Sequence, residues 1–135
     1  MGGGGSGAEG SGNHLFEILK RRLTDTLMSD TEILMQLART IEARKGGDAG
    51  TSYVSSLFAK GEEAVLRKVM EEATETLLAA KEGDKLHLVR EVADLWFHTL
   101  ILLACHGAGP DEVLAELRRR EGTSGIAEKA ARRGE

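Results

Sequence analysis

The sequence predicts an all-α fold, and three features of its composition support this prediction. Only 4% of the 135 residues are aromatic, 30% are charged, and there is a single proline. Residues that favour helices (leucine, alanine, glutamate, lysine and arginine) are abundant, whereas runs of β-branched residues are few. A chain of this length has room for one domain with one core. We therefore expect an antiparallel bundle of four to five helices.

The N-terminal part of the chain is expected to differ from the rest. Glycine and serine dominate residues 1–13, a composition typical of a flexible leader or linker. Residues 14–29 have weak helical periodicity, so they form either an extra helix or a translated segment ahead of a native start near Met28. The predicted domain comprises residues 30–135.

The helices of this domain follow from apolar periodicity and from capping residues. Glycines that permit a left-handed conformation, and a proline at a first helical turn, mark their boundaries. The segment 51–61 is either an irregular connector or a short helix. The expected helices run from about Asp30 to Arg44, Glu62 to Lys81, Asp84 to His106, Pro110 to Arg120 and Ile126 to Arg133.

Two pairs of carboxylates share one spacing: Glu72 with Glu75, and Glu91 with Asp94. A separation of three residues places both acids of a pair on one helix face, about one turn apart, where like charges repel. A divalent cation held between two helices by oxygen ligands would compensate for this repulsion. The pattern therefore predicts a Mg²⁺ site, and the alternative is two solvated acidic faces.

The helix that carries Glu91 and Asp94 gives this hypothesis its main support. Between Leu95 and Cys105 only two residues are polar, so this half of the helix should be buried on most sides. Carboxylates beside leucines lose hydration, which is costly unless a cation or a hydrogen-bond partner replaces the water. The same apolarity predicts that a second subunit covers the helix. The leucines beside the acidic stripe are Leu88, Leu95 and Leu102.

Charge and cysteine content exclude several classes of function. The net charge of −4 gives no basic surplus, so we expect no nucleic-acid partner. A single cysteine, Cys105, excludes an intramolecular disulfide and a cysteine-built zinc site. There is no signal segment, and the apolar runs are far shorter than the roughly 20 residues that span a bilayer. We expect a cytoplasmic protein without a membrane partner.

Several segments together resemble one family, the phosphoribosyl-ATP pyrophosphatases, within the MazG-like all-α nucleotide pyrophosphatases. The signature of this wider group is E-x-x-E followed, after a gap, by E-x-x-D. The resemblance covers about Thr31 to Arg133. Met70 stands where a glycine is expected, a change that removes no ligand, and residues before about Ser29 have no counterpart. The segments are Arg44-Lys45-Gly46-Gly47-Asp48, Ser52-Tyr53-Val54, Leu57-Phe58-Ala59-Lys60-Gly61, Lys68 to Glu75, Glu91 to His98 and Arg119 to Ala130.

The resemblance implies a nucleotide-binding hydrolase of histidine biosynthesis. In that reaction phosphoribosyl-ATP is hydrolysed to phosphoribosyl-AMP and pyrophosphate, with Mg²⁺, in a cytoplasmic homodimer. Two alternatives remain open at this point. One is a housecleaning nucleoside-triphosphate pyrophosphatase that uses the same carboxylates, and the other is a non-catalytic helical interaction module.

Roles for individual residues follow from the motifs and the resemblance. The expected metal ligands are Glu72, Glu75, Glu91 and Asp94. Glu71 and Glu75 are the candidate general bases that would accept a proton from the attacking water. The candidate phosphate-binding residues are Lys68, Arg120, Ser124 and Lys129, although Lys68 could instead form an ordinary ion pair with Glu72. His98 is expected to be a hydrogen-bonded core residue, Cys105 a core residue, and Tyr53 and Trp96 packing residues.

Overall fold

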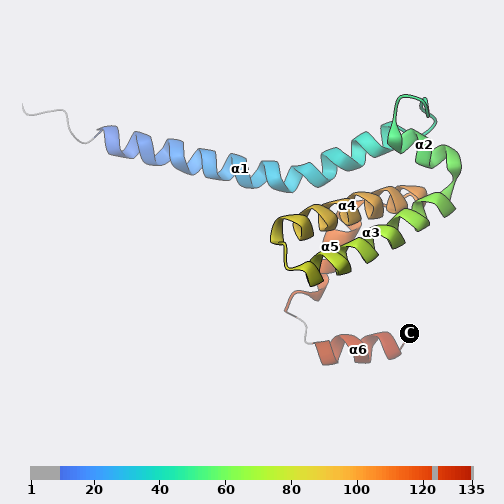
Figure 1. Cartoon of the computed structure of the whole chain (residues 1–135). Helices are drawn as coiled ribbons and strands as arrows, with labels where there is room; N and C mark the ends of the chain where they lie inside the picture. Colours follow the sequence, from blue (N-terminus) through green and yellow to red (C-terminus); the bar gives the residue numbers. More distant parts are fainter. Residues whose placement is uncertain (1–9, 123–124, 135) are drawn as a thin grey trace, which may run out of the picture. The chain divides into compact units, whose positions relative to one another are not determined.

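The structure of the chain is a computed structural model that describes residues 10–122 and 125–134 (Figure 1). These residues form α-helices joined by turns and short connections, and no β-strand occurs among them, which confirms the all-α prediction. The chain divides into two compact units, residues 1–34 and residues 35–135. We describe each unit by itself.

The first unit contains most of helix α1 (Gly10–Ala43), which ends in the second unit. Residues 14–29 are therefore helical, and α1 begins earlier than the expected start near Asp30 because no proline interrupts the segment before it. Its large apolar side chains between His14 and Thr24 are exposed. They are Leu15, Phe16, Ile18, Leu19 and Leu23. The predicted division into leader, extension and domain stays a prediction.

The second unit contains the remaining helices, and their bounds agree with the expected ones to within one or two residues. The open question about segment 51–61 is answered by a helix, whose start is fixed by Ser52. The Ser52 side chain accepts a hydrogen bond from the backbone N–H of Ser55. The helices are α2 (Tyr53–Lys60), α3 (Glu62–Glu82), α4 (Lys85–Cys105), α5 (Pro110–Arg120) and α6 (Gly125–Arg133).

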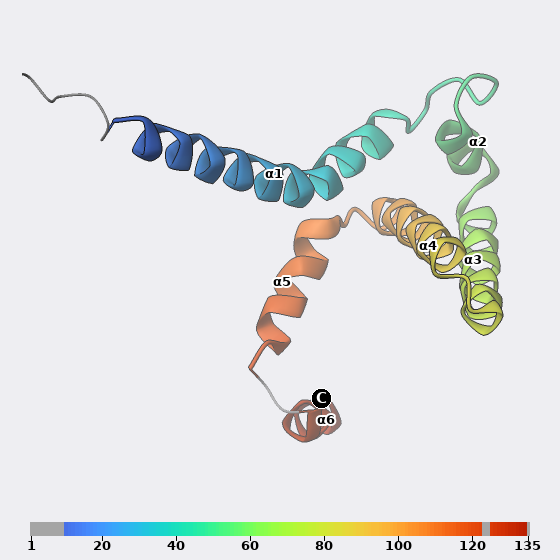
Figure 2. The same cartoon turned by 60° about the vertical axis from the view of Figure 1, so that its left-hand side comes forward.

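Helices α3 and α4 form an antiparallel hairpin and lie side by side in both views (Figures 1 and 2). Gly83 ends α3 with a φ of 77°, a left-handed conformation that glycine adopts without strain. Asp84 then caps α4, because its Oδ1 accepts hydrogen bonds from the backbone N–H groups of Leu86 and His87 at 3.1 and 3.2 Å. The short turn brings the acidic stretches of the two helices face to face.

A histidine–glutamate contact lies at each end of this hairpin. His87 Nδ1 lies 3.1 Å from Glu82 Oε2 at the turn, and His106 Nε2 contacts Glu62 Oε1 at the open end. Both contacts join α3 to residues on or immediately after α4. They link the two helices at points on either side of the acidic stretches.

The Lys45-Gly46-Gly47-Asp48 segment is tied to the core of the second unit. Lys45 Nζ donates a hydrogen bond of 2.7 Å to the backbone carbonyl of Ala104, near the end of α4. Ser55 Oγ donates to the carbonyl of Arg44 at 2.8 Å, and a Cβ at Gly47 would lie only 2.7 Å from that Oγ. A side chain at Gly47 would therefore displace Ser55 Oγ from this hydrogen bond. The buried apolar side chains are Ile41, Val54, Leu57, Val65, Ala79, Leu100, Ile101 and Ala104.

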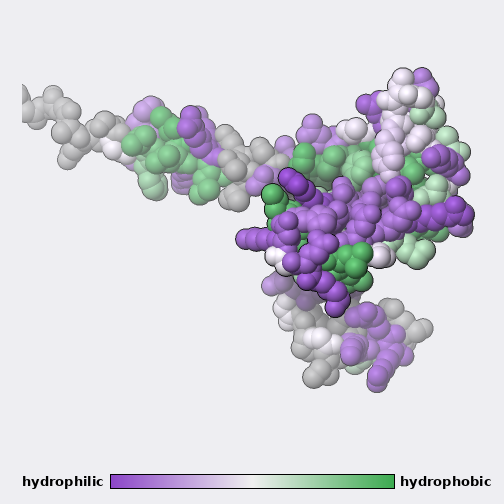
Figure 3. Space-filling view, in the orientation of Figure 1, coloured by the Kyte–Doolittle hydropathy of each residue, from purple (hydrophilic) through white to green (hydrophobic). Residues whose placement is uncertain are grey.

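Apolar side chains also lie on the surface of the second unit. The C-terminal half of α4 is less buried than expected: His98, Leu100, Ile101 and Ala104 are buried, most of its other residues, including Cys105, are half-buried, and Trp96 is 59% exposed. Figure 3 shows apolar side chains interspersed among the polar ones on one face of the molecule. No helix among the described residues has the length and apolarity needed to cross a membrane. Further exposed apolar residues on α3 and α4 are Leu66, Met70, Leu77, Leu78, Leu86 and Val89.

Candidate metal centre

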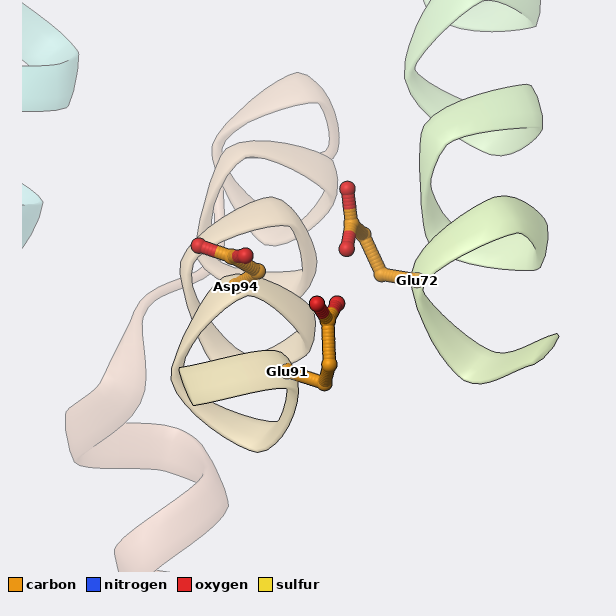
Figure 4. Close-up of side chains that lie close together, drawn as sticks. All are labelled: Glu72, Glu91 and Asp94. Atoms are coloured by element: carbon orange, nitrogen blue, oxygen red, sulfur yellow. The ribbon is translucent and has the colours of Figure 1, made fainter. Parts of the chain in front are cut away.

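Three carboxylates from the hairpin lie together: Glu72 on α3, and Glu91 and Asp94 on α4 (Figure 4). Each offers one carboxylate oxygen, and these oxygens all lie within 4.8 Å of one another. We call these three residues the acid cluster. The structure thus brings together three of the four metal ligands expected from the sequence.

Two oxygens of the acid cluster are buried without a hydrogen-bond partner. They are Oε2 of Glu72 and Oε2 of Glu91. A buried polar atom that makes no hydrogen bond is uncommon in folded proteins and costs free energy, and the cost is greater for an anionic group. Because hard oxygen ligands are the ones that Mg²⁺ prefers, the cluster fits a divalent cation that would satisfy both oxygens.

The surroundings of Glu72 favour its neutral form when no cation is present. The residue is 8% exposed, and burial, followed by the negative charges of Glu75 and Asp94, raises the pKa of its carboxyl to about 7. A cation in the cluster would reverse the balance, because it attracts the ionised carboxylate.

Glu75 and Asp94 are more exposed than the other two expected ligands. Glu75 is not part of the acid cluster, although it is near enough for its charge to act on Glu72. The sequence argument gave the strongest desolvation to Glu91 and Asp94, and this order is wrong. Glu72 is the buried acid and Asp94 is exposed, because Glu72 projects from α3 into the contact with α4 (Figure 4).

His87 is a neighbour of the acid cluster to which the sequence analysis gave no role. Its Nε2 lies 3.2 Å from Glu91 Oε1, and its Nδ1 lies 3.1 Å from Glu82 Oε2. The hydrogen bond with Glu82, followed by the smaller effect of Glu91, raises the pKa of the His87 ring. The signal in the sequence is the four-residue spacing of His87 and Glu91, which places them one turn apart on α4.

His98 is a hydrogen-bonded core residue, as expected. It is 5% exposed, and its Nδ1 lies 2.7 Å from the backbone carbonyl of Asp94. A carbonyl can only accept, so Nδ1 donates this hydrogen bond, and Nε2 lies 2.7 Å from the Tyr53 hydroxyl. Tyr53 is 49% exposed. Partial burial is the main cause that raises the pKa of its hydroxyl, and the nearby charges of Glu72, Glu71 and Asp94 raise it as well, whereas Lys68 lowers it.

Lys68 pairs with a different acid from the one expected. Its Nζ lies 3.1 Å from Glu71 Oε2, whereas the sequence argument placed Glu72 opposite it. Glu72 is turned into the α3–α4 contact, which leaves the exposed Glu71 as the partner. Glu71 also lines a surface hollow of about 340 Å³ on α3, together with Arg67, Met70, Thr74 and Glu75. Both candidate general bases therefore border open solvent.

The basic residues near the C-terminus are only partly described. Arg120 Nε lies 3.0 Å from Glu116 Oε1, and the hydrogen bonds from Arg119 and Arg120 hold the pKa of Glu116 well below its usual value. Lys129 is exposed on α6, and Ser124 lies outside the described residues. A phosphate-binding role for Arg120, Ser124 and Lys129 stays a prediction.

The structure thus places the chain among all-α proteins that carry a cluster of carboxylates between two helices. Comparisons with known proteins identify the family within this class. The family model for phosphoribosyl-ATP pyrophosphohydrolase matches residues 34–121. The chain is 60% identical over 102 residues to a phosphoribosyl-ATP pyrophosphatase from Chromobacterium violaceum, a match that covers 76% of this chain and 94% of that protein.

Two further relatives give the same result. A phosphoribosyl-ATP pyrophosphatase from Nitrosospira multiformis is 58% identical over 106 residues, with 78% of this chain and 88% of that protein covered. One from an Azoarcus species is 56% identical over 106 residues, with 78% and 99% covered. The chain therefore belongs to the phosphoribosyl-ATP pyrophosphohydrolase family and is a hydrolase. The resemblance drawn from the motifs is confirmed.

Proposed function

We propose that the protein is a cytoplasmic Mg²⁺-dependent enzyme that hydrolyses phosphoribosyl-ATP to phosphoribosyl-AMP and pyrophosphate, a step of histidine biosynthesis. Family membership supports the substrate, since the relatives are named for it. The observation that carries the metal dependence is the acid cluster with its two buried, unpartnered carboxylate oxygens. These oxygens need a cation or a donor, and a triphosphate substrate needs its charge neutralised.

The acid cluster would hold Mg²⁺, and Glu75 on the adjacent turn of α3 is available as a further ligand. When bound, Mg²⁺ supplies neutralisation of phosphate charge and activation of water. Glu72 contributes as a carboxylate in this state, although its raised pKa favours the neutral form without the cation. The chain's own contribution is to hold three carboxylates close together on two packed helices.

The remaining roles belong to residues on the open side of α3. Glu71 and Glu75 are the candidate bases that accept the proton of the attacking water, and both line the surface hollow. Lys68 lies beside them and would contact a substrate phosphate once released from Glu71. Tyr53 presents a half-exposed ring next to the same acids, so it borders the space that a substrate would occupy.

The test is pyrophosphate release by the purified chain with phosphoribosyl-ATP and Mg²⁺. We expect Glu72→Gln and Asp94→Asn each to lower kcat/KM at least about 100-fold, because each removes a charged ligand. Glu63→Gln is the matched control, since Glu63 is an exposed acid in the first turn of α3 outside the cluster, and it should keep the wild-type rate.

A panel of ordinary and damaged deoxynucleoside triphosphates completes the experiment. Preference for one of these over phosphoribosyl-ATP would overturn the substrate while leaving the metal centre intact. Absence of pyrophosphate release from every substrate would instead indicate a non-catalytic helical module.

A further inference from the structure

His87 contacts the acid cluster from outside. Its Nε2 lies 3.2 Å from Oε1 of Glu91, whereas Oε2 of the same carboxylate is buried and has no hydrogen-bond partner. The two oxygens of Glu91 are therefore in different states. One contacts the imidazole, and the other is buried without a partner on a side chain that lies in a cluster with Glu72 and Asp94.

His87 is itself held by two residues of the α3–α4 turn. Its Nδ1 lies 3.1 Å from Glu82 Oε2, at the last residue of α3, and its backbone N–H donates to Asp84 Oδ1 at 3.2 Å. The backbone contact fixes the start of the helix, and the side-chain contact fixes the plane of the ring. Both side-chain partners are carboxylates, which only accept, so the ring donates to both at once only as the imidazolium. With a proton on Nε2 the ring donates to Glu91 Oε1 and restricts the rotation of that carboxylate.

From this arrangement we propose that His87 is a positioning residue of the metal centre, which pins Oε1 of Glu91 so that Oε2 remains available to the cation. The inference rests on the proposed metal-dependent function. A carboxylate that is restrained before the cation arrives loses less conformational freedom on binding. His87 thus raises the affinity for Mg²⁺ without being a ligand, since Mg²⁺ prefers oxygen over imidazole nitrogen.

The competing interpretation is an ordinary surface ion pair, because the His87 side chain is 41% exposed. The hairpin offers a matched comparison for this case. His106 makes the corresponding contact with Glu62 at the other end of the hairpin, and neither residue belongs to the acid cluster. If the contact of His87 is purely structural, removing His87 should affect the metal affinity as little as removing His106.

The experiment measures Mg²⁺ binding to the full chain by calorimetry, with Mn²⁺ electron paramagnetic resonance as a second readout of the bound ion. We expect His87→Ala to raise the dissociation constant for Mg²⁺ about 10- to 100-fold, as is usual when the partner of a metal-ligating group is removed. His87→Gln, whose amide can donate to Glu91, should recover most of the loss. His106→Ala should leave the metal affinity unchanged. Circular dichroism verifies that each variant is folded.

The outcomes separate this inference from the function on which it rests. If wild-type protein binds the ion and Glu72→Gln abolishes binding, the metal centre stands. A dissociation constant for His87→Ala equal to that of wild type or of His106→Ala then overturns the role of His87 alone. Tighter binding by His87→Ala would mean that the imidazole competes with the ion, and it also overturns the proposal. Failure of wild-type protein to bind either ion overturns both.

Discussion

Glu72 is the residue at which burial and charge act together. Its carboxyl is nearly inaccessible to water, it adjoins other acids, and one of its oxygens has no partner. Folding without a cation therefore requires either that this carboxyl takes up a proton or that the charge repulsion is tolerated. The raised pKa of about 7 is the measurable consequence of that conflict.

The metal-free protein should lose stability as the pH rises from 4.5 to about 7. The pKa of Glu72 is raised on folding, from 4.5 to about 7, so the folded state binds the proton more tightly. The stability that this proton contributes is fully present below pH 4.5 and is lost as the pH rises through about 7. Thermal unfolding in a chelator should show a Tm contribution from Glu72 that falls between pH 4.5 and about 7 and is nearly constant above about 7.

This prediction is tested by comparing the Tm profiles of variants with that of wild type, because His87 and other groups also titrate and contribute to the wild-type profile. Glu72→Gln should flatten the Tm profile between pH 4.5 and 7, whereas Glu63→Gln should keep it. An unchanged slope in Glu72→Gln would show that Glu72 ionises normally. Added Mg²⁺ should raise the Tm more above pH 7 than below it, because the ion binds the carboxylate and competes with the proton.

At the scale of the element, the α3–α4 hairpin depends on its turn. Gly83 closes α3 and Asp84 opens α4, and His87 lies within the first turn of α4, beside the acid cluster. The cap and the acid cluster are therefore parts of one local structure. A change at the turn should alter both the stability of the hairpin and the position of Glu91.

Asp84→Ala should destabilise the protein by about 1 kcal/mol, since it removes the side chain that accepts hydrogen bonds from Leu86 and His87. Asp84→Ser, which can also cap a helix, should restore most of this loss. Urea unfolding measures the difference. Equal stability of wild type and Asp84→Ala would show that water satisfies these backbone groups equally well.

At the scale of the whole molecule, the hairpin has more apolar surface than its own chain covers. On α3, Leu66, Met70 and Leu77 lie within one narrow sector of the helix and are exposed. On α4, Leu86, Val89 and Trp96 do the same. Exposed apolar stripes on neighbouring helices are typical of a subunit interface.

We expect the protein to be a homodimer that buries these stripes. Trp96→Glu should weaken association by about 2 kcal/mol or more, roughly a 30-fold change, because it places a charge in the apolar stripe. Analytical ultracentrifugation of wild type and variant measures the change. Leu15→Glu, at an exposed apolar residue of α1 in the first unit, is the control and should leave the association unchanged. A monomeric wild type would contradict the prediction.

Much of this fold could be predicted from the sequence because helix boundaries are local. Gly83 with Asp84, and Gly109 with Pro110, mark helix ends through properties of single residues, and the observed bounds agree. The spacing of the acids likewise predicted which residues share a face. Of the expected ligands, Glu72, Glu91 and Asp94 do lie together.

The remaining features depend on how two helices are rotated against each other, which periodicity does not determine. A small rotation decides how deeply Glu72 and Asp94 are each buried in the contact between the helices, and it also decides that Lys68 pairs with Glu71. The contact between His87 and Glu82 needs the geometry of the turn, which sequence spacing alone does not provide. These are packing effects between elements, and they were the points at which the sequence argument was wrong or silent.

The acid cluster is assembled from two helices joined only by Gly83 and Asp84, and this has a kinetic consequence. Contacts between two helices that follow each other along the chain form quickly, because closing the short turn between them costs little entropy. The two halves of the cluster can therefore meet early in folding, ahead of any association between chains. Repulsion between the acids opposes this step, whereas a divalent ion would favour it. The residues proposed to hold the ion would then also influence how fast the hairpin closes.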